Sequence, residues 1–303
     1  MSHRSPLDAL NLVLGSVDAV RNLRAWYVLL ATFAMAGLLT AMAETSLAQG
    51  LSRWWPLHAG AALFVAFYGG NAAGILLMDE ARGAAVRDIG DAVRASLLTA
   101  HRLLLVLLLV AAAYALLAGA LLALLWLCRR AVTGPLVGPL LFGAVVPLGV
   151  VSVGLALLAL LAVVVPLAAP GVWAGARVTD IVRQLARLVR HRLPMVALLM
   201  AAVSVLTAGV GALVTFVVMA GGRIVAQLAV VVVGVDVPAQ QLMAGLFGYG
   251  LRSLGAAGAP AGSTAHAAAA LVGGGVVFVL ALVLPGLVYL RGTCSVYLAL
   301  SDD

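Results

Sequence analysis

The sequence predicts an all-α, polytopic membrane protein with six transmembrane helices. Charged residues make up 10% of the chain, against about 25% in a typical soluble domain. Six apolar runs of 19 to 30 residues carry no charged side chain, and short arginine-bearing segments separate them. About 20 helical residues cross the roughly 30 Å hydrocarbon core of a bilayer, so each run is long enough to span. The runs are Ala25–Ala43, Ala59–Met78, Leu103–Leu127, Leu140–Ala169, Met195–Ala220 and Ala267–Leu290.

Arginine is distributed unevenly between the two sets of connecting segments. All 18 basic residues are arginine, and 13 of them lie in the alternate segments that include both ends of the chain. Positive residues concentrate on the cytoplasmic side of a membrane, so both termini are expected in the cytoplasm. The use of arginine without lysine, together with abundant Ala, Leu, Val and Gly, indicates a bacterial chain and hence the inner membrane. The net charge of +7 then reflects membrane topology, and no nucleic-acid partner is expected.

The first span has two interpretations. Ala41-Met42-Ala43 resembles a signal-peptidase site after an apolar stretch. However, 24 residues precede the apolar run, which is long for the basic region of a signal peptide. We therefore expect this span to be retained in the mature protein.

Each arginine-rich segment contains an amphipathic stretch that leads into the next span, namely Pro6–Arg24, Asp88–Arg102 and Val178–Arg192. Such stretches predict three cytoplasmic helices that lie at the membrane interface, with apolar faces at the acyl boundary. Their arginines would contact anionic lipid headgroups, and an acidic membrane-protein partner could bind the same side. The arginines concerned are Arg94, Arg102, Arg183, Arg187, Arg190 and Arg192.

Recurring motifs indicate internal repetition within one integral membrane domain, residues 1–303. His101-Arg102-Leu103 opens the third span and His191-Arg192-Leu193 opens the fifth. Pro170-Gly171 and Pro285-Gly286 stand at similar places after even-numbered spans. These echoes predict a threefold repeat of helical hairpins, although hairpins with arginine on their inner side generally look alike. The predicted repeats are residues 6–78, 84–169 and 178–290.

Two elements depart from the regular pattern. The fourth run has Pro147 and Pro166 near its ends, and proline kinks a helix, so about 20 of its residues are expected to cross. The outer loop, residues 221–266, contains the apolar stretch Ile224–Val235, which is too short to span, before the breaker Val237-Pro238. This loop forms either helices on the outer surface, which we favour, or a re-entrant hairpin of the kind that lines a pore.

Polar residues inside spans are costly and mark candidate sites. Asn71 stands beside a stripe of small residues at every fourth position of the second span, which would let another helix approach closely. Asn71 could then hydrogen-bond across the helices or contact a solute. The residues of this candidate site are Tyr68, Gly70, Asn71 and Gly74.

Two carboxylates, Asp79 and Glu80, end the second span. A carboxylate pair can relay protons or bind a cation, but Arg82 and Arg87 follow closely, so a solvated helix end balanced by arginine is the simpler interpretation. A metal or pH-sensing role for His101 or His191 would need partners that the sequence does not supply.

The pattern over Gly74–Leu103 and Pro170–Pro194 is an inward span, a small-residue turn, arginine, an amphipathic helix and an outward span. It resembles six-span bacterial inner-membrane proteins related to the membrane domain that precedes some glycerophosphodiester phosphodiesterases. The resemblance implies a bilayer-embedded module. It implies no catalytic residues, because the phosphodiesterase chemistry of those proteins belongs to a separate soluble domain.

The sequence lacks the motifs of a P-loop, a zinc protease and a serine hydrolase. We therefore expect no enzymatic activity, no cofactor and no metal. The favoured function is a scaffold, assembly factor or envelope-maintenance component of the inner membrane. The alternative is a transporter or channel for a small or lipidic solute, acting near Asn71 and residues 221–266. A membrane enzyme is a third hypothesis, but it needs a polar cluster that the sequence does not assemble.

Overall fold

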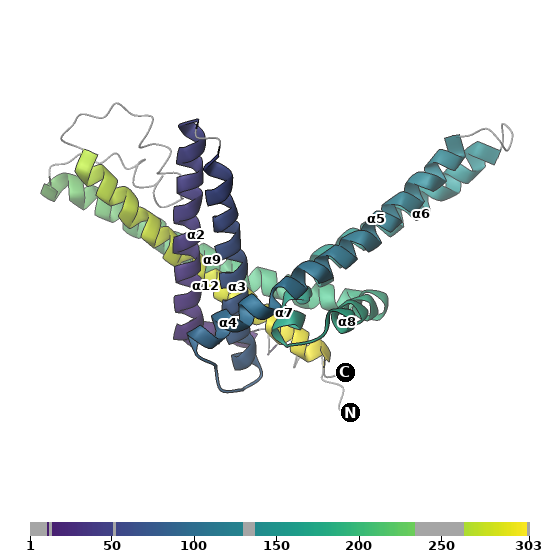
Figure 1. Cartoon of the computed structure of the whole chain (residues 1–303), viewed down its shortest axis with the longest axis horizontal. Coiled ribbons are helices and arrows are strands. Elements are labelled where there is room, and N and C mark those ends of the chain that lie inside the picture. Colours follow the sequence, from purple (N-terminus) through teal and green to yellow (C-terminus); the bar gives the residue numbers. More distant parts are fainter. Residues whose placement is uncertain (1–10, 12–13, 51–52, 130–136, 234–263, 302–303) are drawn as a thin grey trace. The chain divides into compact units, whose positions relative to one another are not determined.

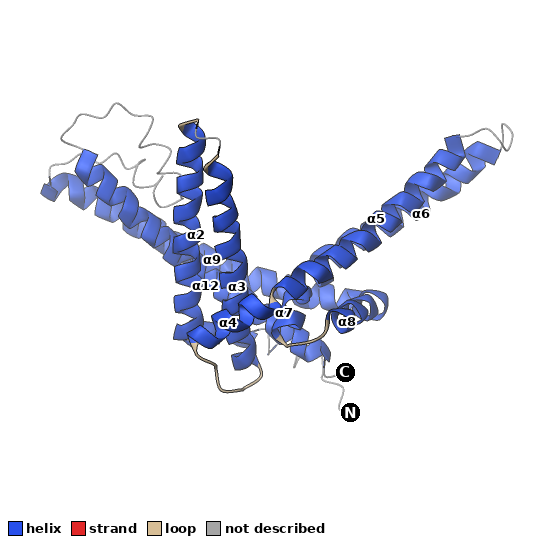
Figure 2. Ribbon diagram, viewed as in Figure 1, coloured by secondary structure: helices blue, strands red, loops and turns tan. Residues whose placement is uncertain are grey.

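The computed structural model describes residues 11, 14–50, 53–129, 137–233 and 264–301. Within these residues the regular structure is entirely helical (Figure 2). Six helices are long and apolar enough to cross a membrane, which confirms the predicted number of spans. The candidate spans are Leu23–Leu47, Trp55–Ala81, Ile89–Cys128, Gly138–Trp173, Leu193–Val225 and Val276–Ser301.

The chain divides into two compact units, and both combine segments that are distant in the sequence. Unit 1 comprises Met1–Val13, Leu97–Ala202 and Thr293–Asp303, and unit 2 comprises Leu14–Ser96 and Val203–Gly292. These boundaries cut across the predicted repeats, so the threefold repeat stays a prediction.

In unit 2, the helices α2 (Leu23–Ala48) and α3 (Trp55–Ala81) form an antiparallel hairpin (Figure 1). A 3-10 helix, Gly15–Arg21, precedes α2, and the side chain of Asn22 caps α2 by accepting a hydrogen bond from the backbone N–H of Ala25. This cap satisfies one of the free N–H groups at the start of a helix, and so it marks where the first span begins.

Unit 2 also contains parts of two long helices, α9 (Leu193–Val233) and α12 (Thr264–Ser301). They touch where a Cβ added to Gly292 would lie 2.8 Å from Cγ1 of Val203. A Cβ on Gly286 would lie 3.2 Å from the side chain of Leu29 on α2. Glycine thus allows α12 to approach both neighbouring helices closely.

In unit 1, α5 (His101–Arg129) and α6 (Val137–Ala159) run side by side (Figure 1). The Oη of Tyr114 on α5 donates a hydrogen bond of 2.7 Å to the carbonyl of Ala156 on α6.

The helix that begins with α6 continues through a π-helical turn, Leu160–Val164, into α7 (Val165–Trp173). This π turn is an irregularity within the fourth candidate span, Gly138–Trp173, and the expectation that about 20 residues of the fourth run cross stays a prediction. Val165 separates the turn from Pro166, whose missing N–H breaks the normal ladder of backbone hydrogen bonds. Pro147, by contrast, lies inside α6.

Two of the three segments predicted to be amphipathic form short helices, α4 (Ile89–Thr99) and α8 (Val178–His191). Helix α8 buries Ile181, Leu185 and Leu188 against α5, α7 and the π turn of unit 1. In the remaining segment, Pro6–Arg24, residues 6–10 and 12–13 lie outside the described part of the chain.

The turns that lead into α4 and α8 have the same hydrogen bonds. Gly83 donates to the carbonyl of Glu80 and Ala84 to that of Asp79, while in the second turn Gly175 donates to Val172 and Ala176 to Gly171. Both glycines are left-handed, with φ of 66° at Gly83 and 81° at Gly175, a conformation that costs other residues energy. The second and fourth spans therefore end in the same type of glycine C-cap.

The outer loop differs from its prediction where the structure describes it. Ile224–Val233 does not form a separate helix but continues α9. Gly221 and Gly222 cost helix stability without stopping a helix, and the next proline is Pro238. Residues 234–263, which hold most of the proposed surface or re-entrant segment, lie outside the described residues.

Candidate functional site

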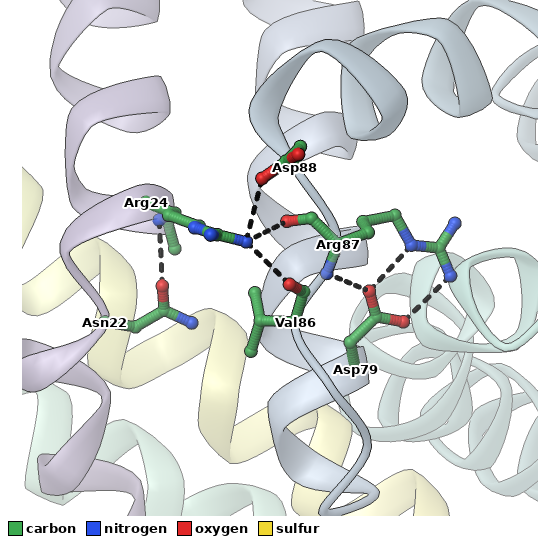
Figure 3. Close-up of polar contacts among 7 residues, drawn as sticks. Asn22, Arg24, Asp79, Val86, Arg87 and Asp88 are labelled. Atoms are coloured by element: carbon green, nitrogen blue, oxygen red, sulfur yellow. Dashed lines mark hydrogen bonds and ion pairs between the residues drawn. The ribbon is translucent and has the colours of Figure 1, made fainter.

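A polar network joins the start of α2, the end of α3 and the segment before α4, all in unit 2 (Figure 3). Asn22, which caps α2, also donates a hydrogen bond of 2.6 Å from its Nδ2 to Oε2 of Glu80 at the end of α3. One side chain therefore fastens the two helix ends together.

Asp79 is the buried charge of this network. It is 6% exposed, and Arg87 binds it with two hydrogen bonds, of 2.7 Å from Nε and 2.8 Å from Nη2 (Figure 3). A buried carboxylate needs such a bidentate partner because an unpaired charge is very costly. The expected balance by arginine is thus present for Asp79, but the expected solvation is not.

Arg24 holds the backbone of the segment before α4. Its Nη1 donates to the carbonyls of Val86 at 2.7 Å and Arg87 at 3.0 Å, and it lies 3.2 Å from a carboxylate oxygen of Asp88 (Figure 3). The ion pair with Asp88 is exposed, with 48% and 77% of the two side chains accessible, so it adds little stability. The two carbonyl contacts therefore matter more for the position of this segment.

Sequence reasoning missed Asn22 and Arg24 as members of this network. The available signal was their position, because residues just before the first span must lie level with the end of the second span in an antiparallel hairpin. The two carboxylates, Asp79 and Glu80, are bound by Arg87 and Asn22. These contacts favour a role in joining the helix ends over a role in proton transfer.

Arg291 on α12 is a further basic group in unit 2. Its Nη1 lies 3.4 Å from the carbonyl of Leu77 on α3, and its buried Nε has no partner in the described structure, as is also true of the Oγ of Ser16. Buried polar atoms without partners are rare, and a water molecule can satisfy such an atom.

The residues of the candidate site around Asn71 make contacts within α3 and with α4. Asn71 is 6% exposed, and its amide donates a hydrogen bond of 2.7 Å to the carbonyl of Phe67 on the same helix. Tyr68 packs its ring against Phe64 with centroids 4.5 Å apart, and its carbonyl accepts a 2.7 Å hydrogen bond from Oγ of Ser96 on α4.

The close helix approach predicted at Gly70 lies one residue earlier. A Cβ on Gly70 would meet no atom within 4 Å, whereas a Cβ on Gly69 would overlap the side chain of Thr32 on α2. Gly74 is buried. Ala66, which lies four residues before Gly70 and so belongs to the same stripe of small residues, is exposed. The register of the α2–α3 contact decides which glycine is needed, and the stripe alone does not contain that register.

The arginines of α8 form the most charged feature of unit 1. Arg183, Arg187 and Arg190 are exposed, whereas Arg192, which follows the last residue of α8, is half-buried. An open groove of about 490 Å³ runs along part of this side. Its lining residues are Asp180, Arg183, Gln184, Arg187, Leu188, His191, Arg192, Leu300 and Ser301.

The remaining predicted headgroup contacts are separate from this groove. Arg94 on α4 is exposed and Arg102 on α5 is half-buried, and neither lines the groove. Of the two interfacial histidines, His191 lines the groove and His101 does not. Among the described residues no group of three or more His, Cys, Asp or Glu side chains could hold a metal ion.

Comparisons with protein-family models, curated proteins and solved structures give no match. The resemblance to the membrane domain of glycerophosphodiester phosphodiesterases therefore stays a prediction from the sequence pattern.

Proposed function

We propose that this chain is a non-enzymatic, multi-pass protein of a bacterial inner membrane that serves as a scaffold, assembly or envelope-maintenance component. The observation that carries the proposal is the construction of α8. Its apolar side chains Ile181, Leu185 and Leu188 are buried, and three arginines of the same helix are exposed. A helix held in this way presents a fixed cationic surface to a membrane or to an acidic partner.

The second support is the use of the polar residues in unit 2. Asp79 and Arg87 bind each other, and Asn22 binds Glu80. These pairs stabilise the ends of α2 and α3, so the four side chains already have a structural role. A scaffold needs such rigid helix ends, whereas a proton relay needs groups that are free to change partners.

The proposal includes the topology and the repeat. The arginine distribution favours both termini in the cytoplasm, which places α4 and α8 at the cytoplasmic interface. The matching turns at Gly83 and Gly175 support a repeated hairpin for the first two predicted units. The third unit lacks such a turn after Pro285-Gly286, because α12 continues to Ser301.

The test is a cellular comparison of three strains: wild type, a deletion, and Arg183→Gln/Arg187→Gln/Arg190→Gln. The triple variant removes the exposed charges without touching the buried face of α8. We expect it to reach wild-type abundance and to reproduce the envelope defect of the deletion, measured as sensitivity to detergent and to an impermeant dye.

A triple variant that behaves as wild type, beside a deletion with a clear defect, would contradict the proposal. The function would then lie in the spans, and the transporter alternative would take precedence. A matched control is Arg94→Gln on α4, which removes one exposed arginine from a different helix.

A further inference from the structure

The groove in unit 1 has two walls with different origins in the sequence. One wall is α8, and the other is the last turn of α12, which contributes Leu300 and Ser301. Three arginines and His191 line the groove beside one carboxylate, that of Asp180. The carboxylate of Asp180 lies 3.6 Å from Nη1 of Arg183, so the lining keeps a net positive charge.

The two walls are fastened to each other. The Oη of Tyr297 on α12 donates a hydrogen bond of 3.1 Å to Oε1 of Gln184 on α8. Tyr297 is 6% exposed and Leu300 is also 6% exposed, so the α12 wall is packed into the unit. A groove whose walls are already in place loses little conformational entropy when a ligand binds.

The charged lining suits a phosphate group. Guanidinium groups present planar forks of N–H donors that match phosphate oxygens, and such charge-assisted hydrogen bonds are stronger than neutral ones. Arg183 and Arg187 stand one helical turn apart on α8, so both can reach one anion.

The charged residues, and not the apolar ones, are the open part of the lining. Leu188 and Leu300 line the groove but are only 4% and 6% exposed. The volume of about 490 Å³ falls within the range of small-molecule sites, roughly 300–1,000 Å³. Anionic phospholipids carry such a phosphate at the membrane surface, where basic helices meet it.

We infer that this groove binds the phosphate of an anionic phospholipid headgroup. Arg183 and Arg187, which are exposed and line the groove, are the principal phosphate contacts. The inference rests on the proposed function in one respect, since it takes α8 to face the cytoplasmic leaflet. It goes beyond that proposal because it assigns one site and one ligand class to part of a charged surface.

The test uses the full chain purified in a mild detergent and native mass spectrometry with added phosphatidylglycerol or phosphatidylcholine. The variant is Arg183→Gln/Arg187→Gln, and the matched control is Arg190→Gln, since Arg190 is exposed on the same helix but does not line the groove. We expect wild type and control to prefer phosphatidylglycerol, and the double variant to bind it about tenfold or more weakly. Unchanged thermal unfolding of both variants would show that the fold is intact.

Three outcomes would overturn the inference. Equal loss in Arg190→Gln would show a diffuse charged surface, which would leave the scaffold proposal standing. Equal affinity of the wild type for both lipids would show that no anionic headgroup is recognised. Displacement of phosphatidylglycerol by millimolar inorganic phosphate, with no dependence on the apolar part, would identify a soluble phosphate as the ligand.

Discussion

Helices α4 and α8 occupy equivalent places in the sequence, before the third and fifth spans, yet α4 buries small side chains and α8 buries large apolar ones. Helix α8 buries the large residues Ile181, Leu185 and Leu188. Helix α4 buries Ala92 and Ser96, while Val93 and Leu97 are 41% and 47% exposed. The two helices therefore meet the rest of the protein in different ways, although similar turns precede them.

The difference assigns the two helices different physical roles. Large apolar side chains that the protein leaves uncovered on α4 are suited to the acyl region of a bilayer. Those of α8 are already covered by protein, so its outward side is the arginine side. We infer that packing of large apolar side chains holds α8 in place, whereas α4 depends more on polar contacts such as the hydrogen bond from Ser96 and on lipid.

The largest expected effect is that of Ile181→Ala. Ile181 is 1% exposed and lies against Gly171 of α7, where an added Cβ would stand 3.0 Å from its Cγ1. Removal of such a buried side chain costs about 2–5 kcal/mol. Equilibrium unfolding in a mild detergent, with hydrogen exchange over residues 178–191, measures this loss.

The matched change on α4 is Leu97→Ala, which we expect to cost less than about 1 kcal/mol because the side chain is half-exposed. Equal losses for Leu97→Ala and Ile181→Ala would show that both helices are held by their large apolar residues, and the contrast between them would fail.

The second effect concerns what α4 and α8 share, the glycine turn. Gly83→Ala and Gly175→Ala should each destabilise the protein by about 1–2 kcal/mol, because both glycines have positive φ. No atom lies within 4 Å of either added Cβ, so the cost comes from the backbone alone. The same unfolding measurement applies.

Gly90→Ala is the control for these turns. Gly90 lies inside α4, also with no atom within 4 Å of an added Cβ. This change should stabilise the helix by roughly 0.4–1 kcal/mol. If Gly83→Ala is harmless and Gly175→Ala is not, the two turns are not equivalent and the repeat loses its main support.

The third effect is that of Ser96→Ala, which removes the hydrogen bond from α4 to the carbonyl of Tyr68. We expect a loss of about 1 kcal/mol, the typical net value of one such bond. Hydrogen exchange over residues 89–99 should rise, while exchange over residues 178–191 should not change. Ser301→Ala provides the control, because its hydroxyl is exposed and bonds only to Leu298 of the same helix turn among the contacts resolved.

The six spans could be predicted because the thickness of a bilayer sets both the length and the composition of a spanning helix. The apolar face of α8 could also be predicted, since Ile181, Leu185 and Leu188 follow the helical period. What covers that face could not, because lipid and protein interior are both apolar and select the same residues. The extension of α9 beyond Ala220 was missed for a related reason: a spanning helix need not end where the bilayer ends.

The candidate sites show more clearly what a sequence alone does not predict. Gly69 and Gly70 are equivalent by composition, and only the position of Thr32 on the neighbouring helix makes one of them necessary. Asn22 and Arg24 act on residues 58 to 63 positions away in the sequence, so their role appears once the hairpin is paired. The groove likewise needs Leu300 and Ser301 beside α8, a pairing that no local pattern contains.

The smallest expected effect is that of charge on the attachment of α8. The sequence pattern alone predicts that anionic lipid holds this helix, so that Arg183→Gln/Arg187→Gln/Arg190→Gln would release it. The buried face of α8 predicts the reverse, because exposed charges contribute within about 0.5 kcal/mol each whereas the covered apolar side chains contribute several times more. The measurement is hydrogen exchange over residues 178–191 in nanodiscs. This exchange should change by only about twofold when the three arginines are replaced, and by no more when anionic lipid is replaced by neutral lipid or when salt is raised. Ile181→Ala should raise exchange over the same residues far more. If exchange rose strongly in the arginine variant, and rose equally in neutral lipid and at high salt, lipid headgroups would be what holds α8. Lipid would then hold both α4 and α8, and the two helices would differ only in the side chains that they expose.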